Sequence, residues 1–287
     1  MGQITSLFVH KVTAQASAGV RTRDLVEGLG IDPDAPVDPS RMVASSDYYE
    51  FFAELAKRDP DGATLPLRTG ASMRTNEYGA FGFAWKSAPN LHGSFVRAER
   101  YAQVLTNVTR YEIETTSDGV LFRLRRSGER QLGLRLSNEA SIASVVAISD
   151  EVCTAPFAPD AVYFRHPAPG SIEAHVAHFG CPVIFASDKD AILVSGEALA
   201  SPNRLGDAGI SAFFDQHLQA ELAALADDNG LEKQVKIAVA QTLSDGVPTV
   251  SLIAAKLGAS GRTLQRRLSD KGLSFQILGP VDKVIDP

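Results

Sequence analysis

The stretch TVSLIAAKLGASGRTLQRRLSDKG, residues 249–272, constrains the fold most, because it fits two short helices joined by a tight turn. Thr249 is placed to cap the first helix, and Gly258 can end that helix in a left-handed conformation. Ser260 can then cap a second helix, which closes at Gly272. The stretch therefore predicts a helix-turn-helix within an all-α C-terminal segment.

The second of these helices has two different sides. At 100° per residue, Leu264 and Leu268 fall on one side and can anchor the helix to a core. Polar side chains gather on the opposite side and its flanks: Arg262, Gln265, Arg266, Arg267, Ser269 and Lys271. Arginine pairs with guanine, glutamine with adenine, and flanking cations with phosphates, so we predict that these six residues contact DNA. The alternative is a surface helix with a solvated basic face.

Charge is distributed unevenly along the chain. The net charge is −6, but residues 249–275 carry 5 basic and 1 acidic side chains. From Glu232 onward there are 8 Lys/Arg against 5 Asp/Glu, which leaves 20 against 29 for residues 1–231. A small basic module on an acidic body favours a nucleic-acid partner at that end.

The rest of the chain predicts a mixed domain of helices and antiparallel strands. RYEIETTSDGVLFRLRR, residues 110–126, alternates in polarity about Ser117–Gly119 and predicts a β-hairpin. Further strands are expected in LGLRLS (132–137), in AVYFRHPAP (161–169), and as a pair in CPVIFASDKDAILVS (181–195) about a turn at Ser187–Asp190. Helices are expected within 20–32, 45–62, 80–107 (two helices broken at Ala88–Asn90), 138–153, 171–180 and 207–226. We predict an α+β domain over 1–226, a linker over 227–231, and the helix-turn-helix segment over 232–287.

Residues 253–275, IAAKLGASGRTLQRRLSDKGLSF, resemble the first helix-turn-helix of AraC/XylS-type transcription regulators. The matching positions are Ile253-Ala254, Leu257-Gly258, Ser260, Leu264-Gln265-Arg266, Leu268, Gly272 and Ser274-Phe275. The N-terminal body resembles the arabinose-binding sensor domain of one branch of that family, so the likeness covers about residues 15–276. The resemblance implies DNA and a small-molecule effector as partners, and it implies that residues 1–226 sense the effector and mediate oligomerisation. It places base reading on Arg262, Gln265 and Arg266.

The sequence departs from this family after Phe275. Family members continue with a basic linker helix and a second helix-turn-helix, whereas Gly279-Pro280 would stop a helix here. This leaves two hypotheses open. The first is that the chain is a DNA-binding regulator. The second is that the chain is a truncated regulator, which either acts only as a sensor or dimerisation module, as a homodimer or with a full-length regulator, or is a nonfunctional remnant.

The densest aromatic stretch, YGAFGFAW (78–85), is the candidate effector site. Phe81, Phe83 and Trp85 could line an apolar pocket, and the alternative is that they are core residues. The spacing His175-x-x-His178-x-x-Cys181 suits zinc, but no fourth ligand is evident, so we expect no metal and no cofactor.

Other features exclude further classes of protein. The sequence has none of the common nucleotide-binding or hydrolase motifs, so we do not expect an enzyme. Two cysteines in 287 residues make no disulfide framework, and no apolar run is long enough to cross a membrane. A cytoplasmic protein is therefore expected.

Overall fold

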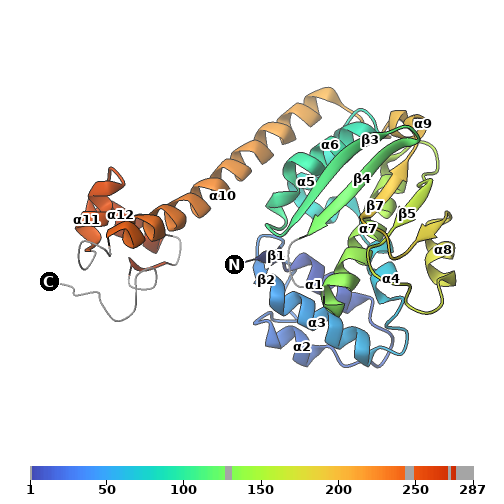
Figure 1. Cartoon of the computed structure of the whole chain (residues 1–287), viewed down its shortest axis with the longest axis horizontal. Helices are drawn as coiled ribbons and strands as arrows, with labels where there is room; N and C mark the ends of the chain where they lie inside the picture. Colours follow the sequence, from blue (N-terminus) through green and yellow to red (C-terminus); the bar gives the residue numbers. More distant parts are fainter. Residues whose placement is uncertain (1, 127–130, 243–248, 271–272, 276–287) are drawn as a thin grey trace. The chain divides into compact units, whose positions relative to one another are not determined.

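The computed structural model describes residues 2–126, 131–242, 249–270 and 273–275. The chain divides into two compact units, Met1–Gln219 and Ala220–Pro287. Helix α10 (Ala208–Thr242) continues through this boundary and contains residues 227–231, where the sequence suggested a linker (Figure 1). None of the described helices is long and apolar enough to cross a membrane.

The first unit combines helices with strands, as the sequence predicted, and the second contains helices only among its described residues. The helices of the first unit are α1 (Leu7–Ala14), α2 (Arg23–Gly28), α3 (Ser45–Arg58), α4 (Leu65–Ala71), α5 (Gly79–Ser87), α6 (Leu91–Tyr101), α7 (Leu132–Val152), α8 (Glu173–Phe179) and α9 (Gly196–Ala200), with short 3-10 turns η1 (Thr75–Tyr78) and η2 (Ala102–Val104). Its strands are β1 (Gln3–Thr5), β2 (Met42–Ala44), β3 (Thr109–Thr116), β4 (Gly119–Arg126), β5 (Ala161–Tyr163), β6 (Val183–Ile184) and β7 (Asp190–Val194).

Five strands form one sheet in the order β3-β4-β7-β5-β6. The predicted hairpin is confirmed, with β3 and β4 antiparallel and Thr116 opposite Gly119 across the turn. The predicted pairing within residues 181–195 is wrong, because β5 lies between β6 and β7 and pairs with both. The connection between β6 and β7 therefore crosses β5 and does not close a hairpin.

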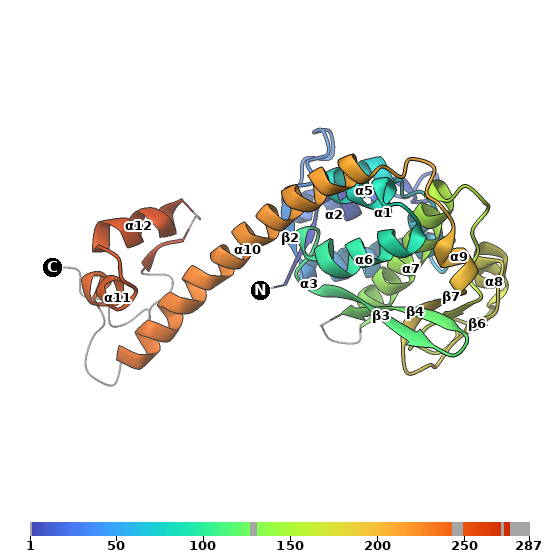
Figure 2. The same cartoon turned by 90° about the horizontal axis from the view of Figure 1, so that it is seen from above.

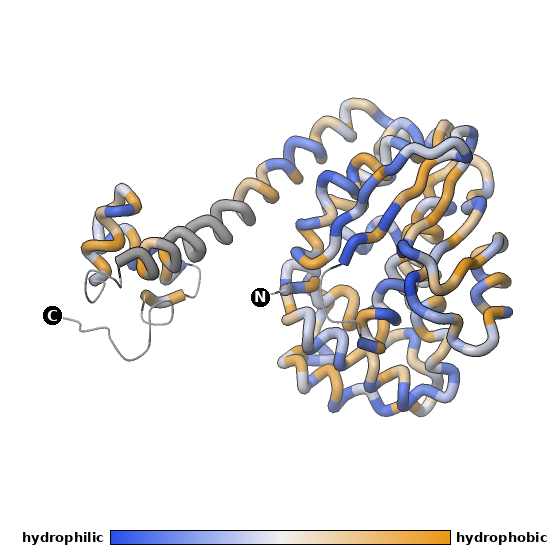
Figure 3. Tube along the Cα trace, viewed as in Figure 1, coloured by the Kyte–Doolittle hydropathy of each residue, from blue (hydrophilic) through white to orange (hydrophobic). Residues whose placement is uncertain are grey.

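Helices α6 and α7 cover the same face of this sheet (Figure 2). The ring of Phe95 on α6 stacks on Phe122 of β4 with ring centroids 4.2 Å apart. Arg126, four residues further along β4 and on the same face, donates to the Ser141 hydroxyl of α7 at 2.8 Å. Figure 3 accordingly shows hydrophobic central strands and a hydrophilic strand β3 at the edge.

The opposite face of the hairpin is polar and carries cross-strand ion pairs. Arg125 Nε lies 2.8 Å from Glu112 Oε2, and Arg123 pairs with Glu114 in the same way. At the outer edge of β3, the backbone amide of Ile113 donates to Glu99 Oε1 of α6 at 2.9 Å. The sheet therefore buries one face against helices, and the other face of the hairpin carries charged side chains that pair across the two strands.

Helix α7 begins at Leu132, so the strand predicted over residues 132–137 is wrong. The alternation of leucines there reflects a helix that is buried on most of its circumference. Gly133 in its first turn lies directly against α3, since a Cβ at this position would come 1.7 Å from the Tyr49 carbonyl oxygen. The absence of a side chain lets α3 and α7 approach closely.

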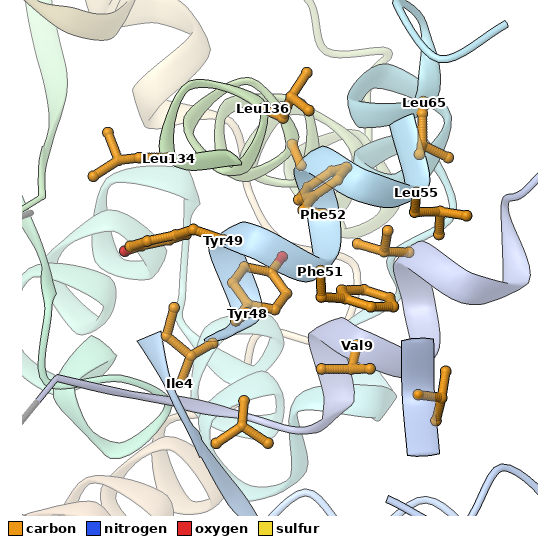
Figure 4. Close-up of a cluster of buried hydrophobic side chains, with 14 of the residues drawn as sticks. Ile4, Val9, Tyr48, Tyr49, Phe51, Phe52, Leu55, Leu65, Leu134 and Leu136 are labelled. Carbon is orange, nitrogen blue, oxygen red and sulfur yellow. The ribbon is translucent and has the colours of Figure 1, made fainter. Parts of the chain in front are cut away.

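An aromatic cluster fixes α1, α3 and α7 to the small β1–β2 sheet (Figure 4). Phe52 and Leu55 of α3 are 0% exposed and point into this cluster. Apolar side chains at this spacing give α3 one hydrophobic face, and burying them supplies much of the driving force for folding this part of the unit. Figure 4 labels ten members: Ile4, Val9, Tyr48, Tyr49, Phe51, Phe52, Leu55, Leu65, Leu134 and Leu136.

Candidate functional site

The second unit contains the two helices and the turn that the sequence predicted. Helix α11 (Val250–Lys256) starts at Thr249, whose hydroxyl accepts from the Leu252 amide at 3.3 Å. Gly258 has φ +66°, a left-handed conformation that glycine adopts without strain. Helix α12 (Gly261–Ser269) starts at Ser260, whose hydroxyl accepts from the Thr263 amide at 3.1 Å. Local hydrogen bonds therefore fix both helix starts, and the glycine permits the turn between the two helices.

A small apolar core lies beneath α12. Leu264 and Leu268 are each 1% exposed, which confirms their predicted anchoring role. They pack with residues from α10, from α11 and from the segment after α12: Val235, Ala238, Val239, Ile253, Ala254 and Phe275. This packing determines which side of α12 remains in solvent.

The side of α12 left in solvent carries the predicted DNA contacts. The exposed residues are Arg262, Gln265, Arg266, Arg267 and Ser269. Among the described residues, none of these three arginines has an ion-pair partner, so each guanidinium is available for a base or a phosphate. Lys271, the sixth predicted contact, lies outside the described residues, as do Gly272 and residues 276–287.

The aromatic residues proposed as an effector site do not converge. Phe81 and Trp85 are 4% and 1% exposed and line a cavity of only about 40 Å³. Phe83 is 38% exposed and stacks on Phe214 of α10, with ring centroids 5.2 Å apart. A cavity that small is far below the volume of ordinary ligand pockets.

A cavity of about 830 Å³ lies where the ends of β4 and β5 and the start of β7 meet the start of α7. Its apolar walls are Val108, Leu124, Leu132, Leu134 and Pro167. Its charged residues are Arg110, Arg125, Arg126, Arg135, Arg165 and Asp190. Sequence reasoning missed this cavity, and the signal available was RLRR (123–126), which places arginines on both faces at the end of a strand.

A buried carboxylate, Glu139 of α7, lies beside this cavity. His175 Nε2 lies 2.9 Å from Glu139 Oε2, and His166 Nε2 and Arg135 Nε each lie 3.1 Å from Oε1. Burial alone would raise the pKa of Glu139, but hydrogen bonds and electrostatic interactions with His166 and His175 outweigh it and lower the pKa of Glu139 to about 2. Glu139 therefore stays ionised and neutralises Arg135.

The same contacts account for the histidine spacing noted in the sequence. His175 faces Glu139, and the ring of His178 packs edge-on against Phe179. Within the described ranges, no group of three or more His, Cys, Asp or Glu side chains is arranged to hold a metal ion.

Residues 19–203 match the model of the arabinose-binding domain of AraC transcription regulators. Among curated proteins, the chain is 25% identical over 265 residues to the ornithine utilization regulator of Pseudomonas aeruginosa. It is 26% identical over 278 residues to an uncharacterized HTH-type transcriptional regulator of Mycobacterium tuberculosis. Each match spans 91% of this chain and 76% of the relative.

Among solved structures, the chain is similar to the transcriptional regulator CdpR from Pseudomonas aeruginosa. The TM-score is 0.50 at 16% sequence identity, over 90% of this chain and 80% of that one. At this identity the likeness concerns the fold.

Proposed function

The chain belongs to the AraC transcription regulators that carry an arabinose-binding domain at the N-terminal end, and from this premise we propose a sequence-specific DNA-binding regulator that responds to a small-molecule effector. The first unit would sense the effector and mediate self-association. The second unit would read DNA. Effector binding would act by shifting the populations of conformers that differ in how the DNA-reading helix is presented.

The solvent-exposed side of α12 carries this proposal. Arg262, Gln265 and Arg266 stand on the side opposite the buried Leu264 and Leu268. A short helix with such a face fits the major groove, and residues of its N-terminal half meet base edges there. The positive balance of charge around this helix supports the same partner.

Replacing Arg266 with alanine tests the assignment. We expect Arg266→Ala to weaken specific binding by about 1–3 kcal/mol and to relax the preference at one base pair. Genomic fragments selected by the wild-type chain give the site, and fluorescence anisotropy then gives the affinity of each variant. Arg204→Ala, which removes an exposed arginine of the first unit, is the matched control. An unchanged footprint and affinity for Arg266→Ala would show that this face does not read bases.

The alternative function is a sensor or dimerisation module without competent DNA binding, as a homodimer or as a heterodimer with a full-length regulator. A salt titration of DNA binding separates it from the leading proposal. Preference for one sequence that persists at physiological salt supports the regulator. Weak and equal affinity for all DNA sequences supports the sensor or dimerisation module. On either proposal we expect a cytoplasmic protein without enzymatic activity.

A further inference from the structure

We propose that the 830 Å³ cavity of the first unit binds a small organic anion with at least one carboxylate group and an apolar body. This inference rests on the proposed function, since it names the chemical class of the effector. The volume lies within the range of ordinary small-molecule sites, and all the lining residues that carry the argument belong to the first unit.

Two of the five arginines that line the cavity already have carboxylate partners. Arg135 pairs with the buried Glu139, and Arg125 pairs with Glu112 on the outer face of the hairpin. These two arginines therefore already have carboxylates of the protein as counter-charges.

The other three arginines have no carboxylate partner among the described residues. Arg110 and Arg165 are exposed at the rim of the cavity and take part in none of the ion pairs found there. Asp190 is the single acidic lining residue in the described chain. Its two oxygens accept from the Arg165 backbone amide at 2.9 Å and from the Asn138 side chain at 3.1 Å. The cavity thus has an excess of positive charge, although the whole chain has a net charge of −6.

Arg126 is the partly buried member of these three. Its guanidinium donates to the hydroxyls of Thr109, Ser137 and Ser141, with Nε 2.9 Å from Thr109 and Nη2 2.8 Å from Ser141. Hydroxyls satisfy hydrogen bonds but leave the charge uncompensated, and a charge in partly desolvated surroundings gains strongly from an anion. The first turn of α7 adds to this field, because Leu132 and Leu134 line the same cavity and the start of a helix carries a partial positive charge.

The walls decide which anion fits. Val108, Leu124 and Leu132 present an apolar surface that favours an aliphatic or aromatic body. A neutral sugar would leave the arginines without a counter-charge and would bury hydroxyls against these walls. A sugar phosphate would satisfy the charge but would meet the same apolar surface. An organic carboxylate matches both features, because guanidinium binds carboxylate through two parallel hydrogen bonds.

The test measures ligand binding by the full chain without DNA, so that its result is independent of the DNA-binding proposal. Isothermal calorimetry and thermal shift are recorded with benzoate and octanoate, with the neutral analogue benzamide, with L-arabinose, and with glucose 6-phosphate. The cavity variant is Arg110→Gln with Arg165→Gln, which should fold because both side chains are exposed and without ion pairs in the described structure. The control is Arg21→Gln with Arg204→Gln, which makes the same change of charge at exposed arginines that do not line this cavity.

We expect at least one carboxylate to bind and to raise the melting temperature, and benzamide and L-arabinose to do neither. The cavity variant should lose about tenfold or more in affinity for that carboxylate, whereas the control variant should bind as the wild type does. Three results would each overturn the proposal. Benzamide or L-arabinose could bind as tightly as the carboxylates, or glucose 6-phosphate could bind more tightly than benzoate and octanoate. The third is an equal loss of carboxylate affinity in the two double variants. Absence of binding by every probe would also count against it. Sequence-specific DNA binding in the same preparation would then show that the proposed function stands without this ligand class.

Discussion

The two units use arginine in opposite ways. The first unit turns Arg126 toward its interior, among the hydroxyls of Thr109, Ser137 and Ser141, beside a cavity. The second turns Arg262 and Arg266 outward from a helix whose buried side is leucine. An enclosed cation selects a small ligand by shape and counter-charge, whereas a row of exposed cations suits an extended polyanion.

The two units also differ in the polarity of their buried residues. The first unit buries polar groups, among them Glu139, Asp190 and His175, each with a partner. In the described part of the second unit, the buried residues are all apolar. A polar interior fixes the geometry needed around a ligand, while a small apolar core only has to hold one helix in place. Four substitutions test this comparison.

Phe52→Ala should have the largest effect, and only on the first unit. The side chain is 0% exposed within the aromatic cluster, so its removal should cost about 3–5 kcal/mol of that unit's free energy of unfolding. Hydrogen exchange resolved by segment, together with urea unfolding, would measure this loss. Phe83→Ala is the control, since that ring is 38% exposed and should cost far less. Equal protection losses in α11 and α12 would show that the two units unfold as one.

Leu264→Ala should destabilise the second unit by about 2–5 kcal/mol. The leucine is 1% exposed in a small core, so the variant should lose DNA binding while the first unit keeps its melting transition. Leu252→Ala, at a leucine that is 44% exposed on α11, provides the comparison. If both variants bound DNA alike, Leu264 would not be needed to hold α12 in place.

Glu139→Gln tests the polar interior of the first unit. Loss of a buried, charge-assisted hydrogen-bond acceptor should cost roughly 1.5–3 kcal/mol at neutral pH. Because the pKa of Glu139 is lowered from 4.5 to about 2 in the folded chain, its stabilisation is complete above about pH 4.5 and is lost as the pH falls toward 2. Urea unfolding at pH 7 and pH 3 should therefore show a smaller gap between wild type and variant at pH 3. Glu50→Gln, at an exposed glutamate, should show no gap at either pH, and a gap independent of pH for Glu139→Gln would contradict the assigned ionisation.

Ser260→Ala should have the smallest effect, about 1 kcal/mol on the second unit. It removes the hydroxyl that accepts from the Thr263 amide at the start of α12. Ser251→Ala, at an exposed serine within α11, is the matched control. Thermal melting, and then DNA affinity, would be measured for both variants to detect the lower stability of Ser260→Ala. Identical melting temperatures of the two variants would exclude a capping role for Ser260.

Local signals predicted the second unit better than the first. Capping at Thr249 and Ser260, the turn at Gly258 and the two faces of α12 all follow from residues within a few positions of one another. The β3–β4 hairpin is local in the same way. The pairing of β6 and β7 with β5 depends on contacts between distant segments, which no turn signal encodes.

The cavity was out of reach of sequence reasoning for the same reason. It draws on residues from Asn107 to Asp190, which are brought together only by the sheet and α7. The aromatic stretch at 78–85 was a less informative signal than the arginines of residues 123–126. Phe81 and Trp85 are core residues, and Phe83 is partly exposed and stacks on Phe214. Burial of aromatic rings is common in cores, so their density in a sequence does not distinguish packing from ligand binding.

The hydrogen bond between Glu99 and the Ile113 amide has a consequence for the behaviour of the chain in a crowded cell. Strand β3 ends the sheet, and an open strand edge is a template on which another polypeptide can add and start aggregation. Glu99 occupies one amide of that edge, and the charges of Arg110, Glu112 and Glu114 discourage a neighbour along the rest. The hairpin that borders the cavity can thus remain at the surface without recruiting foreign strands.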